Sequence, residues 1–383
     1  MITAVKIRLK PTEEQEILFR KSCGVARWSY NYFLAENMNH YEETGKYLKE
    51  TEARKYINNV LKPTTHTWLK EVGSNVMKQA VKDADLAIKR WLKGISGKPK
   101  FKCKHQCKDS FYVNYESLKR TKNGFKGEKL GNVKTCNPLP KLKKDEHYLN
   151  PRISFDGTYW YLSVSYEKEF EQVELTDESL GIDLGVKDLA IVSNGKVYKN
   201  INKTKKVKRL EKKLKREQRK FSRKLERNIS GYTKDRKPIY KKPLKDMKNI
   251  AKQKKLIKHL YKQLSDIRKN HLHQTTSDIV KTKPYRIVME DLNVKGMMKN
   301  KHLVKSIAEQ CFYEFKRQMK YKCERLGILF IEADRWYPSS KTCSHCGKIK
   351  KDLKLSDRTF HCECGFTLDR DLNASINLAN YQI

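Results

Sequence analysis

Hydrophobic residues recur at helical spacing in three stretches of the chain. The residues from Thr12 to Gln15 form a capping box, which predicts the start of a helix that runs to about Tyr41. A second helical pattern covers residues 67–92. Between residues 201 and 270 most apolar residues lie three, four or seven positions apart, which predicts two long helices. One glycine and two prolines mark the break between these helices, at Gly231, Pro238 and Pro243.

Other stretches alternate between apolar and polar residues and predict strands. The first ten residues alternate in their second half, so the N-terminus is expected to form a strand. Residues 152–167 predict a hairpin that turns at Asp156 and Gly157. Residues 97–142 are basic with interleaved aromatics, which fits a nucleic-acid face and a solvated strand edge equally well. The pattern therefore predicts a β-rich module that is interrupted early by a helical insertion.

The chain carries a large excess of positive charge. Its 383 residues include 84 Lys and Arg against 44 Asp and Glu, a formal net charge of +40. The 5 Trp, 20 Tyr and 13 Phe are too many for a disordered basic tail. Such self-repulsion in a folded protein predicts a polyanionic partner, and nucleic acid is the leading candidate. Residues 201–270 hold 28 Lys and Arg but 6 Asp and Glu, so more than half of the net charge lies there.

The sequence predicts a cytoplasmic protein that is associated with the nucleoid when it acts and has no membrane partner. No window approaches the ~18 apolar residues of a membrane span, and no apolar signal core follows the N-terminus. Ten cysteines are too few for a disulfide scaffold, and clustered thiols in a reducing compartment indicate metal. The Cys103/Cys107 pair is a weak metal candidate without a matching second pair. The six thiols outside the C-terminal cluster, interpreted as buried or inert, are Cys23, Cys103, Cys107, Cys136, Cys311 and Cys323.

Four cysteines near the C-terminus have the spacing of a zinc ribbon. Two residues separate Cys343 from Cys346, one separates Cys362 from Cys364, and fifteen lie between the pairs. One intervening residue makes the second pair tight. Cys364 is still predicted as the fourth ligand, and His361 is the fallback. Four protein ligands close the coordination sphere, so the predicted zinc is structural and not catalytic.

Acidic residues stand at the ends of predicted elements in three places. Asp183 lies in an apolar strand between two glycines, where a charge beside a sheet core is costly. Glu290 ends a second short apolar strand, and strand ends are where open sheets place their chemistry. Asp369 and Asp371 open an apparent helix near the C-terminus. Taken singly, Asp183 fits a turn residue equally well, and acids at a helix start are often caps.

Together these acids predict a metal site in an otherwise cationic protein. Converging carboxylates repel one another unless cations neutralise them. Oxygen ligands suit Mg²⁺ or Mn²⁺, which keep waters and bind through few carboxylates plus substrate phosphate. Two such ions about 3.5–4 Å apart activate a water and stabilise the leaving oxygen in phosphodiester hydrolysis. The acids therefore predict a metal-dependent nuclease or polynucleotidyl transferase.

The order of these motifs carries a family resemblance. The chain has the Asp183 strand, the basic helices, the Glu290 strand, SSKTCSHCG from Ser339, CECG from Cys362 and DRDLNAS from Asp369. This order resembles the TnpB (OrfB) family of insertion-sequence-encoded RuvC-like nucleases, which are relatives of the type V CRISPR effectors. The N-terminal stretches VKIRLKPTEEQE and CGVARWSYNYF are also similar to the start of that family. The resemblance therefore covers nearly the whole chain.

The resemblance implies a multidomain fold with α+β and α/β parts. It implies an RNase H-like (RuvC) nuclease domain with an inserted zinc ribbon, and an N-terminal β-barrel-like wedge module interrupted by a helical recognition lobe. Asp183, Glu290 and Asp371 are implied as the catalytic residues and as ligands of Mg²⁺ or Mn²⁺, with Asp369 as the rival of Asp371. The implied activity is cleavage of double-stranded DNA beside a short transposon-adjacent motif, directed by a guide RNA from the end of the element. A monomer is expected in this complex.

The domain boundaries follow from these assignments. They are 1–10 and 97–176 for the wedge-like module, 11–96 for the recognition lobe, 177–338 and 367–383 for the nuclease domain with its basic hairpin at 201–270, and 339–366 for the zinc ribbon.

Two other functions fit the same residues. A transposase that performs strand transfer itself uses the same two-metal acids, and it joins excised ends without any RNA. A non-catalytic nucleic-acid-binding regulator of transposition has structural acids, so Asp183→Ala and Glu290→Ala leave its activity unchanged.

Overall fold

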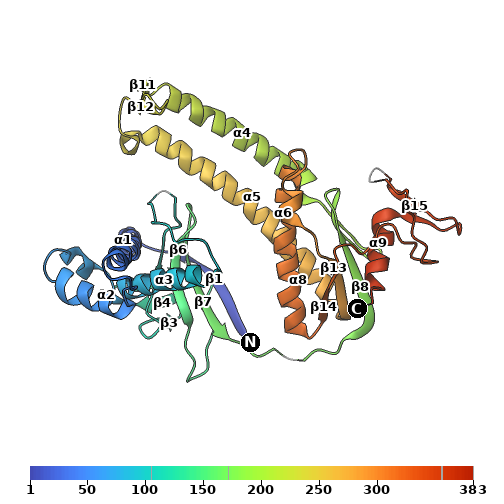
Figure 1. Ribbon diagram of the computed structural model, residues 1–383, viewed down its shortest axis with the longest axis horizontal. Coiled ribbons are helices and arrows are strands. Elements are labelled where there is room, and N and C mark those ends of the chain that lie inside the picture. Colours follow the sequence, from blue (N-terminus) through green and yellow to red (C-terminus); the bar gives the residue numbers. More distant parts are fainter. Residues whose placement is uncertain (105, 171, 355–356, 383) are drawn as a thin grey trace. The chain divides into compact units, whose positions relative to one another are not determined.

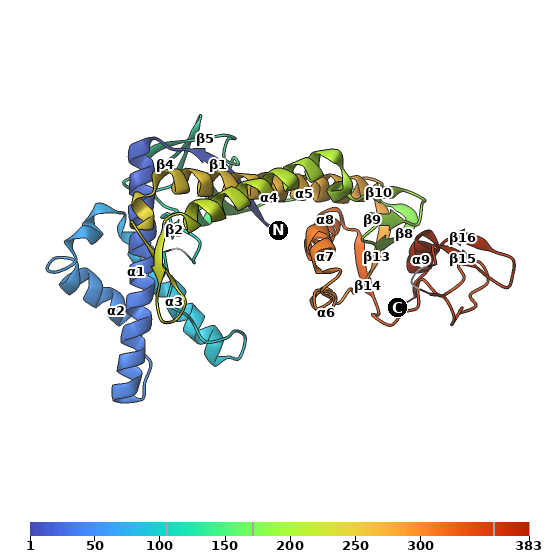
Figure 2. The same ribbon diagram turned by 90° about the horizontal axis from the view of Figure 1, so that it is seen from above.

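The computed structural model describes residues 1–104, 106–170, 172–354 and 357–382. The chain divides into two compact units, Met1–Glu169 and Phe170–Ile383. Each unit has its own sheet and its own hydrophobic core (Figures 1 and 2). Among the described helices, none is both long enough and apolar enough to span a bilayer.

The first unit is built on a seven-stranded antiparallel sheet in the order β2-β6-β7-β1-β5-β4-β3. Its strands are β1 (Ile2–Lys10), β2 (Ser110–Tyr112), β3 (Lys119–Thr121), β4 (Gly124–Gly127), β5 (Gly131–Thr135), β6 (Leu149–Phe155) and β7 (Trp160–Glu167). The pairing of β6 with β7 confirms the predicted hairpin. Strands β2 and β3 are the edges, and no pairing of described residues joins them. The expected barrel-like closure is therefore not found, and the sheet is open.

Three α-helices belong to the first unit: α1 (Glu13–Thr44), α2 (Glu50–Tyr56) and α3 (Ser74–Leu92). The predicted capping box is confirmed, because the Thr12 amide donates to Gln15 Oε1 (3.1 Å) and the Gln15 amide donates to Thr12 Oγ1 (3.3 Å). The second helix begins later than the sequence predicted. A π-helical turn η1 (Ile57–Leu61) and a 3₁₀ turn η2 (Thr67–Glu71) come first, and Gly73 is extended (ψ 136°), which prevents helix continuity.

The second unit is built on a mixed five-stranded sheet in the order β10-β9-β8-β13-β14. Its strands are β8 (Thr176–Leu184), β9 (Asp188–Val192), β10 (Val197–Lys199), β13 (Pro284–Glu290) and β14 (Leu329–Ala333). The first three form an antiparallel meander, whereas β13 runs parallel to both β8 and β14. Parallel neighbours need long crossover connections, and helices supply them here.

Helices cover both faces of this mixed sheet (Figure 1). One face packs against α5 (Lys248–Val280) and α8 (Phe312–Leu326), where Leu272 and Phe315 meet Ile182 and Met289 in a buried cluster. The other face packs against α9 (Arg370–Ala379), where Leu378 contacts Val288. The short helices α6 (Val294–Met297) and α7 (Val304–Gln310) lie between β13 and α8 in the chain.

The strongly basic segment forms the predicted pair of long helices. Helix α4 (Lys205–Glu226) lies against α5 through a buried cluster, Val207, Leu214, Leu260 and Leu264 (Figures 1 and 2). The break between them holds a small hairpin, β11 (Ile229–Tyr232) and β12 (Pro238–Tyr240). Short 3₁₀ turns precede the two helices, η3 (Ile201–Lys203) and η4 (Leu244–Asp246).

Candidate functional site

Strand register brings Asp183 and Glu290 to neighbouring positions. Ile182 on β8 lies opposite Met289 on the parallel strand β13, and the two acids follow these residues directly. Adjacent strands lie about 4.8 Å apart, and matching positions on them point to the same face. The two carboxylates therefore share one face of the sheet near the carboxyl ends of two parallel strands.

Gly181 allows helix α9 to lie directly on this face. Gly181 precedes Asp183 by two positions and therefore faces the same side. A Cβ atom at Gly181 would lie 1.9 Å from Ser375 O and 2.4 Å from Ala379 N. The backbone of α9 is therefore in contact with the backbone of β8, an approach that only glycine permits.

Two side chains of the same face hold the C-terminal end of α9. Ser179 Oγ donates to Ala379 O at 2.6 Å, and Arg286 Nη2 donates to the same oxygen at 2.7 Å. Ser179 and Arg286 lie opposite each other in the β8–β13 register, and Arg286 Nε donates to Ser179 Oγ at 2.7 Å. Because the helix ends beside Ser179, it runs antiparallel to β8 and directs its N-terminus toward Asp183.

The two C-terminal acids have different partners at the start of α9. Asp369 is the N-cap, because its Oδ1 accepts hydrogen bonds from the backbone N–H groups of Asp371 and Leu372 at 3.0 and 3.1 Å. The Asp371 carboxylate instead lies 3.0 Å from Arg370 and 3.7 Å from Arg358. Asp369 is therefore engaged by the helix backbone, whereas Asp371 is held by side chains that can exchange partners.

The acids at the strand ends and the helix start interact electrostatically. Burial and then the nearby carboxylates of Glu290 and Asp371 raise the pKa of Asp183 well above its usual value, against the opposing charge of Arg370. No described Lys, Arg or His forms an ion pair with Asp183. A divalent cation would relieve this repulsion, so the donor set fits Mg²⁺ or Mn²⁺.

The adjacent acids Glu290 and Asp291 also have different hydrogen-bond partners. Lys316 Nζ donates to Asp291 at 3.0 Å and Arg335 also binds it, and these hydrogen bonds lower the pKa of Asp291. Glu290 instead accepts a hydrogen bond from Ser339 Oγ, and it forms no ion pair among the described residues. Asp291 is thus neutralised within the protein, whereas Glu290 remains available to bind a cation.

Helix α9 also positions the segment that carries Ser339. Asn377 Nδ2 donates to the backbone oxygens of Ser339 (2.7 Å) and Thr342 (2.6 Å), and Asn373 Nδ2 donates to Thr342 O at 2.7 Å. Asn373 Oδ1 accepts from the Ser344 amide at 3.0 Å. Sequence reasoning missed these residues. The available signal was the pair of asparagines four residues apart, which lie on one helix face.

Replacing Gly181 with alanine is expected to displace α9 and destabilise the second unit. Overpacking typically costs about 1–3 kcal/mol, and contact with backbone favours the upper end, so the melting temperature should fall by about 5 °C or more. Thermal unfolding measures the change. Gly231→Ala is the matched control, since a Cβ atom there meets nothing within 4 Å. Equal melting temperatures for the two variants would contradict the packing described above.

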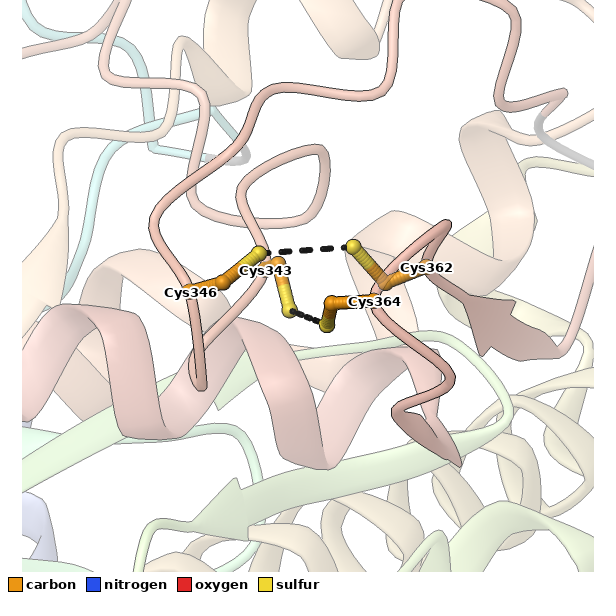
Figure 3. A group of neighbouring side chains, drawn as sticks. All are labelled: Cys343, Cys346, Cys362 and Cys364. Atoms are coloured by element: carbon orange, nitrogen blue, oxygen red, sulfur yellow. Dashed lines mark hydrogen bonds between the residues drawn. The ribbon is translucent and has the colours of Figure 1, made fainter.

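The four C-terminal cysteines converge on one point (Figure 3). Their sulfur atoms all lie within 4.8 Å of one another, with 3.9 Å between Cys343 and Cys364 and 3.5 Å between Cys346 and Cys362. A tetrahedral ion with zinc–sulfur bonds of 2.3 Å requires sulfur separations of about 3.8 Å. Cys362 and Cys364 lie in the turn between β15 (Thr359–His361) and β16 (Thr367–Asp369). The cluster therefore has the ligands and spacing of a structural zinc site.

The surroundings favour the thiolate form of one cysteine. Burial is the largest single influence and opposes ionisation of Cys343. Hydrogen bonds from the amides of Cys346 and His345 and from the side chains of Cys362 and Cys346 together outweigh it and lower the pKa to about 7. His361 lies outside the cluster, with Nδ1 3.1 Å from Thr367 Oγ1. Within the described residues the four cysteines are the one group of three or more possible ligands this close together. Among the residues that the structure describes, the Cys103/Cys107 pair gains no further ligand, and the carboxylates form a more open arrangement.

Three parts of the chain match known sequence families. Residues 1–46 match a helix-turn-helix domain of the OrfB IS605 type, residues 161–301 match the OrfB IS605 family described as a probable transposase, and residues 312–378 match the Cas12f1-like TNB domain. The chain is 29% identical to InsQ of Escherichia coli (strain K12), described as a candidate RNA-guided DNA endonuclease, over 98% of this chain and 91% of InsQ. It is 26% identical to a Streptomyces pristinaespiralis protein of the same description, over 98% and 88% of the two chains.

The fold is similar to that of one solved Cas12f1 effector. The structure of a Cas12f1–sgRNA–target DNA complex matches with a TM-score of 0.55 and 13% identity, over 99% of both chains. The fold, the sequence motifs and the relatives all point to the same family. Together these findings support a protein of the TnpB (OrfB) family, which is related to the type V CRISPR effectors.

Proposed function

We infer that the protein is an RNA-guided DNA endonuclease of an IS605-type insertion sequence. The observation that carries this function is the convergence of the acids at the ends of β8 and β13 with the start of α9, in a chain similar to the RNA-guided endonucleases over nearly its whole length. The expected target is double-stranded DNA beside a short transposon-adjacent motif, and the expected guide is an RNA from the end of the element. Base pairing then supplies the sequence specificity.

Asp183, Glu290 and Asp371 are the catalytic residues in this proposal. The repulsion that raises the pKa of Asp183 supports a cation between these carboxylates. Mg²⁺ usually keeps several waters and needs only one or two carboxylates plus substrate phosphate, so the open arrangement of the acids suits it. Bound there, Mg²⁺ or Mn²⁺ supplies an activated water and charge stabilisation for the leaving oxygen. Ser339 orients Glu290, and α9 keeps Asp371 near the two strand acids.

The second unit is proposed to be an RNase H-like (RuvC) nuclease domain. Its antiparallel meander followed by two parallel strands, with helices on both faces, supports this assignment. The cysteine cluster is proposed to bind structural Zn²⁺ within 339–366. The first unit, with its open sheet and helices, is proposed to supply the wedge-like module and the recognition lobe.

The outer face of α4 is proposed to bind the phosphate backbone of the nucleic acid. Six exposed cations line a groove of ≈ 1110 Å³ along α4 and α5, at Lys205, Lys206, Arg209, Lys212, Lys213 and Arg216. These positions recur at helical spacing, so the cations form one continuous face over three turns. Of the six, only Arg216 has an acidic partner among the described residues, Glu217 at 3.4 Å. A polyanion provides the counter-charge that this face lacks.

Charge reversal on this face tests its role. The double variant Lys212→Glu/Lys213→Glu is expected to weaken nucleic-acid binding and to reduce the slope of log K against log salt by about 0.7–0.9 per lost phosphate contact. Binding is measured by titration at several salt concentrations. The control is Lys234→Glu/Lys237→Glu, which changes the same charge in the segment between β11 and β12. A double variant at 212 and 213 with the wild-type salt slope would exclude phosphate contacts there.

The bound RNA tests the guided function as a whole. The protein is purified from cells that carry its element, and the co-purifying RNA is sequenced. A discrete RNA from the end of the element is expected, and plasmid cleavage with Mg²⁺ should depend on it. The absence of a discrete RNA would contradict the guided function even if nuclease activity survived. A strand-transfer transposase would instead join excised ends without any RNA.

A further inference from the structure

Trp336 is unusually exposed for a large aromatic residue. It leaves 86% of its surface uncovered, the largest fraction among the large apolar and aromatic side chains of the described residues. Exposing an indole forgoes the stabilisation that its burial would provide. Residues 334–336 are exposed between the buried Ala333 and Ser339, so the ring of Trp336 is open to contact with a partner.

The loop that carries Trp336 is held firmly on both sides. The Trp336 amide donates to Asp334 Oδ1 at 2.8 Å, and the Tyr337 amide donates to Asp334 O at 3.1 Å. Tyr337 packs edge-to-face against Tyr381 at 4.9 Å, and its hydroxyl donates to Asn377 O at 3.2 Å. The indole therefore projects from a fixed backbone, so little conformational entropy is lost when a partner covers it.

The same loop contacts the candidate active site. Arg335 binds Asp291, the residue after Glu290, and Ser339 donates directly to Glu290. Trp336 lies between these two contacts in the chain. The indole is therefore carried by a loop that contacts the strand end bearing Glu290 on both sides of Trp336.

We propose that Trp336 stacks on a base of the DNA strand that is cleaved at the Asp183–Glu290 site. This inference rests on the proposed function. Every base presents a π-face, so stacking holds a strand without reading its sequence. Such tolerance suits a nuclease whose specificity comes from base pairing with RNA. Stacking also favours an unpaired strand, because bases within a duplex are already stacked on one another.

Kinetics of the RNA-bound protein test this contact. Base–aromatic stacking contributes enough binding free energy that Trp336→Ala should raise KM for DNA by about 10-fold. The kcat at saturating DNA should stay close to that of the wild type. Trp336→Phe keeps an aromatic face and should restore most of the affinity. Tyr313→Ala is the matched control, because Tyr313 is also 70% exposed in this unit but lies on α8. Its KM should equal that of the wild type.

An abasic scan of the DNA identifies the stacked base. Single abasic sites are placed one at a time along the cleaved strand near the cut. At one position the missing base should raise KM in the wild type by about 10-fold and have little further effect in Trp336→Ala. Such non-additivity is expected only if the indole and that base are in contact.

The outcomes separate this inference from the proposed function. If the wild type shows no RNA-dependent cleavage, the proposed function fails. If the wild type cleaves, Asp183→Ala does not, and Trp336→Ala keeps the wild-type KM, then the stacking contact alone is wrong. A loss of kcat in Trp336→Ala without coupling to any abasic position would also overturn it, since a structural role or a protein partner would then explain the exposed indole.

Discussion

Asp183→Ala is expected to abolish DNA cleavage while the protein still folds and binds RNA. The substitution removes the carboxylate that lies beside Glu290 in the strand register and near Asp371 at the start of α9. Loss of several kcal/mol of transition-state stabilisation corresponds to a rate reduction of at least about 10³-fold. The folded state should not suffer, because burial and like charges already disfavour an ionised Asp183 when no cation is present. Plasmid cleavage under single-turnover conditions measures the loss.

Asp177→Ala is the matched control for this prediction. Asp177 lies on the same strand, β8, but is exposed near its other end. This variant should cleave at the wild-type rate. Equal activity of Asp183→Ala and Asp177→Ala would favour the alternative in which the acids are structural and the protein is a non-catalytic regulator.

Cys364→Ser is expected to remove the proposed zinc ion and unfold the segment around it. Structural zinc contributes about 10–16 kcal/mol of binding free energy in small zinc domains, and that energy is folding energy. Loss of order should also reach the candidate nuclease site, because Asn373 and Asn377 of α9 hold the backbone beside the first cysteine pair and Ser339. Metal analysis and limited proteolysis between the two cysteine pairs measure the effect.

His361→Ala distinguishes the two candidates for the fourth zinc ligand. The Cys364 sulfur lies within the four-sulfur cluster, whereas His361 contacts Thr367 instead. The histidine variant should therefore keep one zinc ion per chain. Loss of zinc from His361→Ala together with retention in Cys364→Ser would show that the fallback ligand is the correct one.

Local patterns predicted the elements that carry chemistry, because such patterns depend on neighbours in the sequence. The capping box at Thr12, the hairpin at Asp156 and the two basic helices all arise from near neighbours, and the structure bears them out. The short spacing within each cysteine pair likewise indicated the sulfur cluster.

The contacts that hold the candidate site together were not predictable in the same way. Gly181 matters because it meets Ser375 and Ala379, which lie far away in the sequence. Ser339 and Arg286 likewise act on residues of other elements, Glu290 and Ala379. The expected barrel-like closure failed for a related reason, since strand alternation does not determine whether two edge strands meet.

A reprogrammed guide tests the central claim most directly. The guide segment of the bound RNA is replaced by an unrelated sequence, and the complex is given two plasmids that carry the original or the new match beside the same adjacent motif. The account predicts that cleavage moves entirely to the plasmid with the new match and requires Asp183. Continued cleavage of the original plasmid, or equal cleavage of both, would contradict RNA-guided action by this protein.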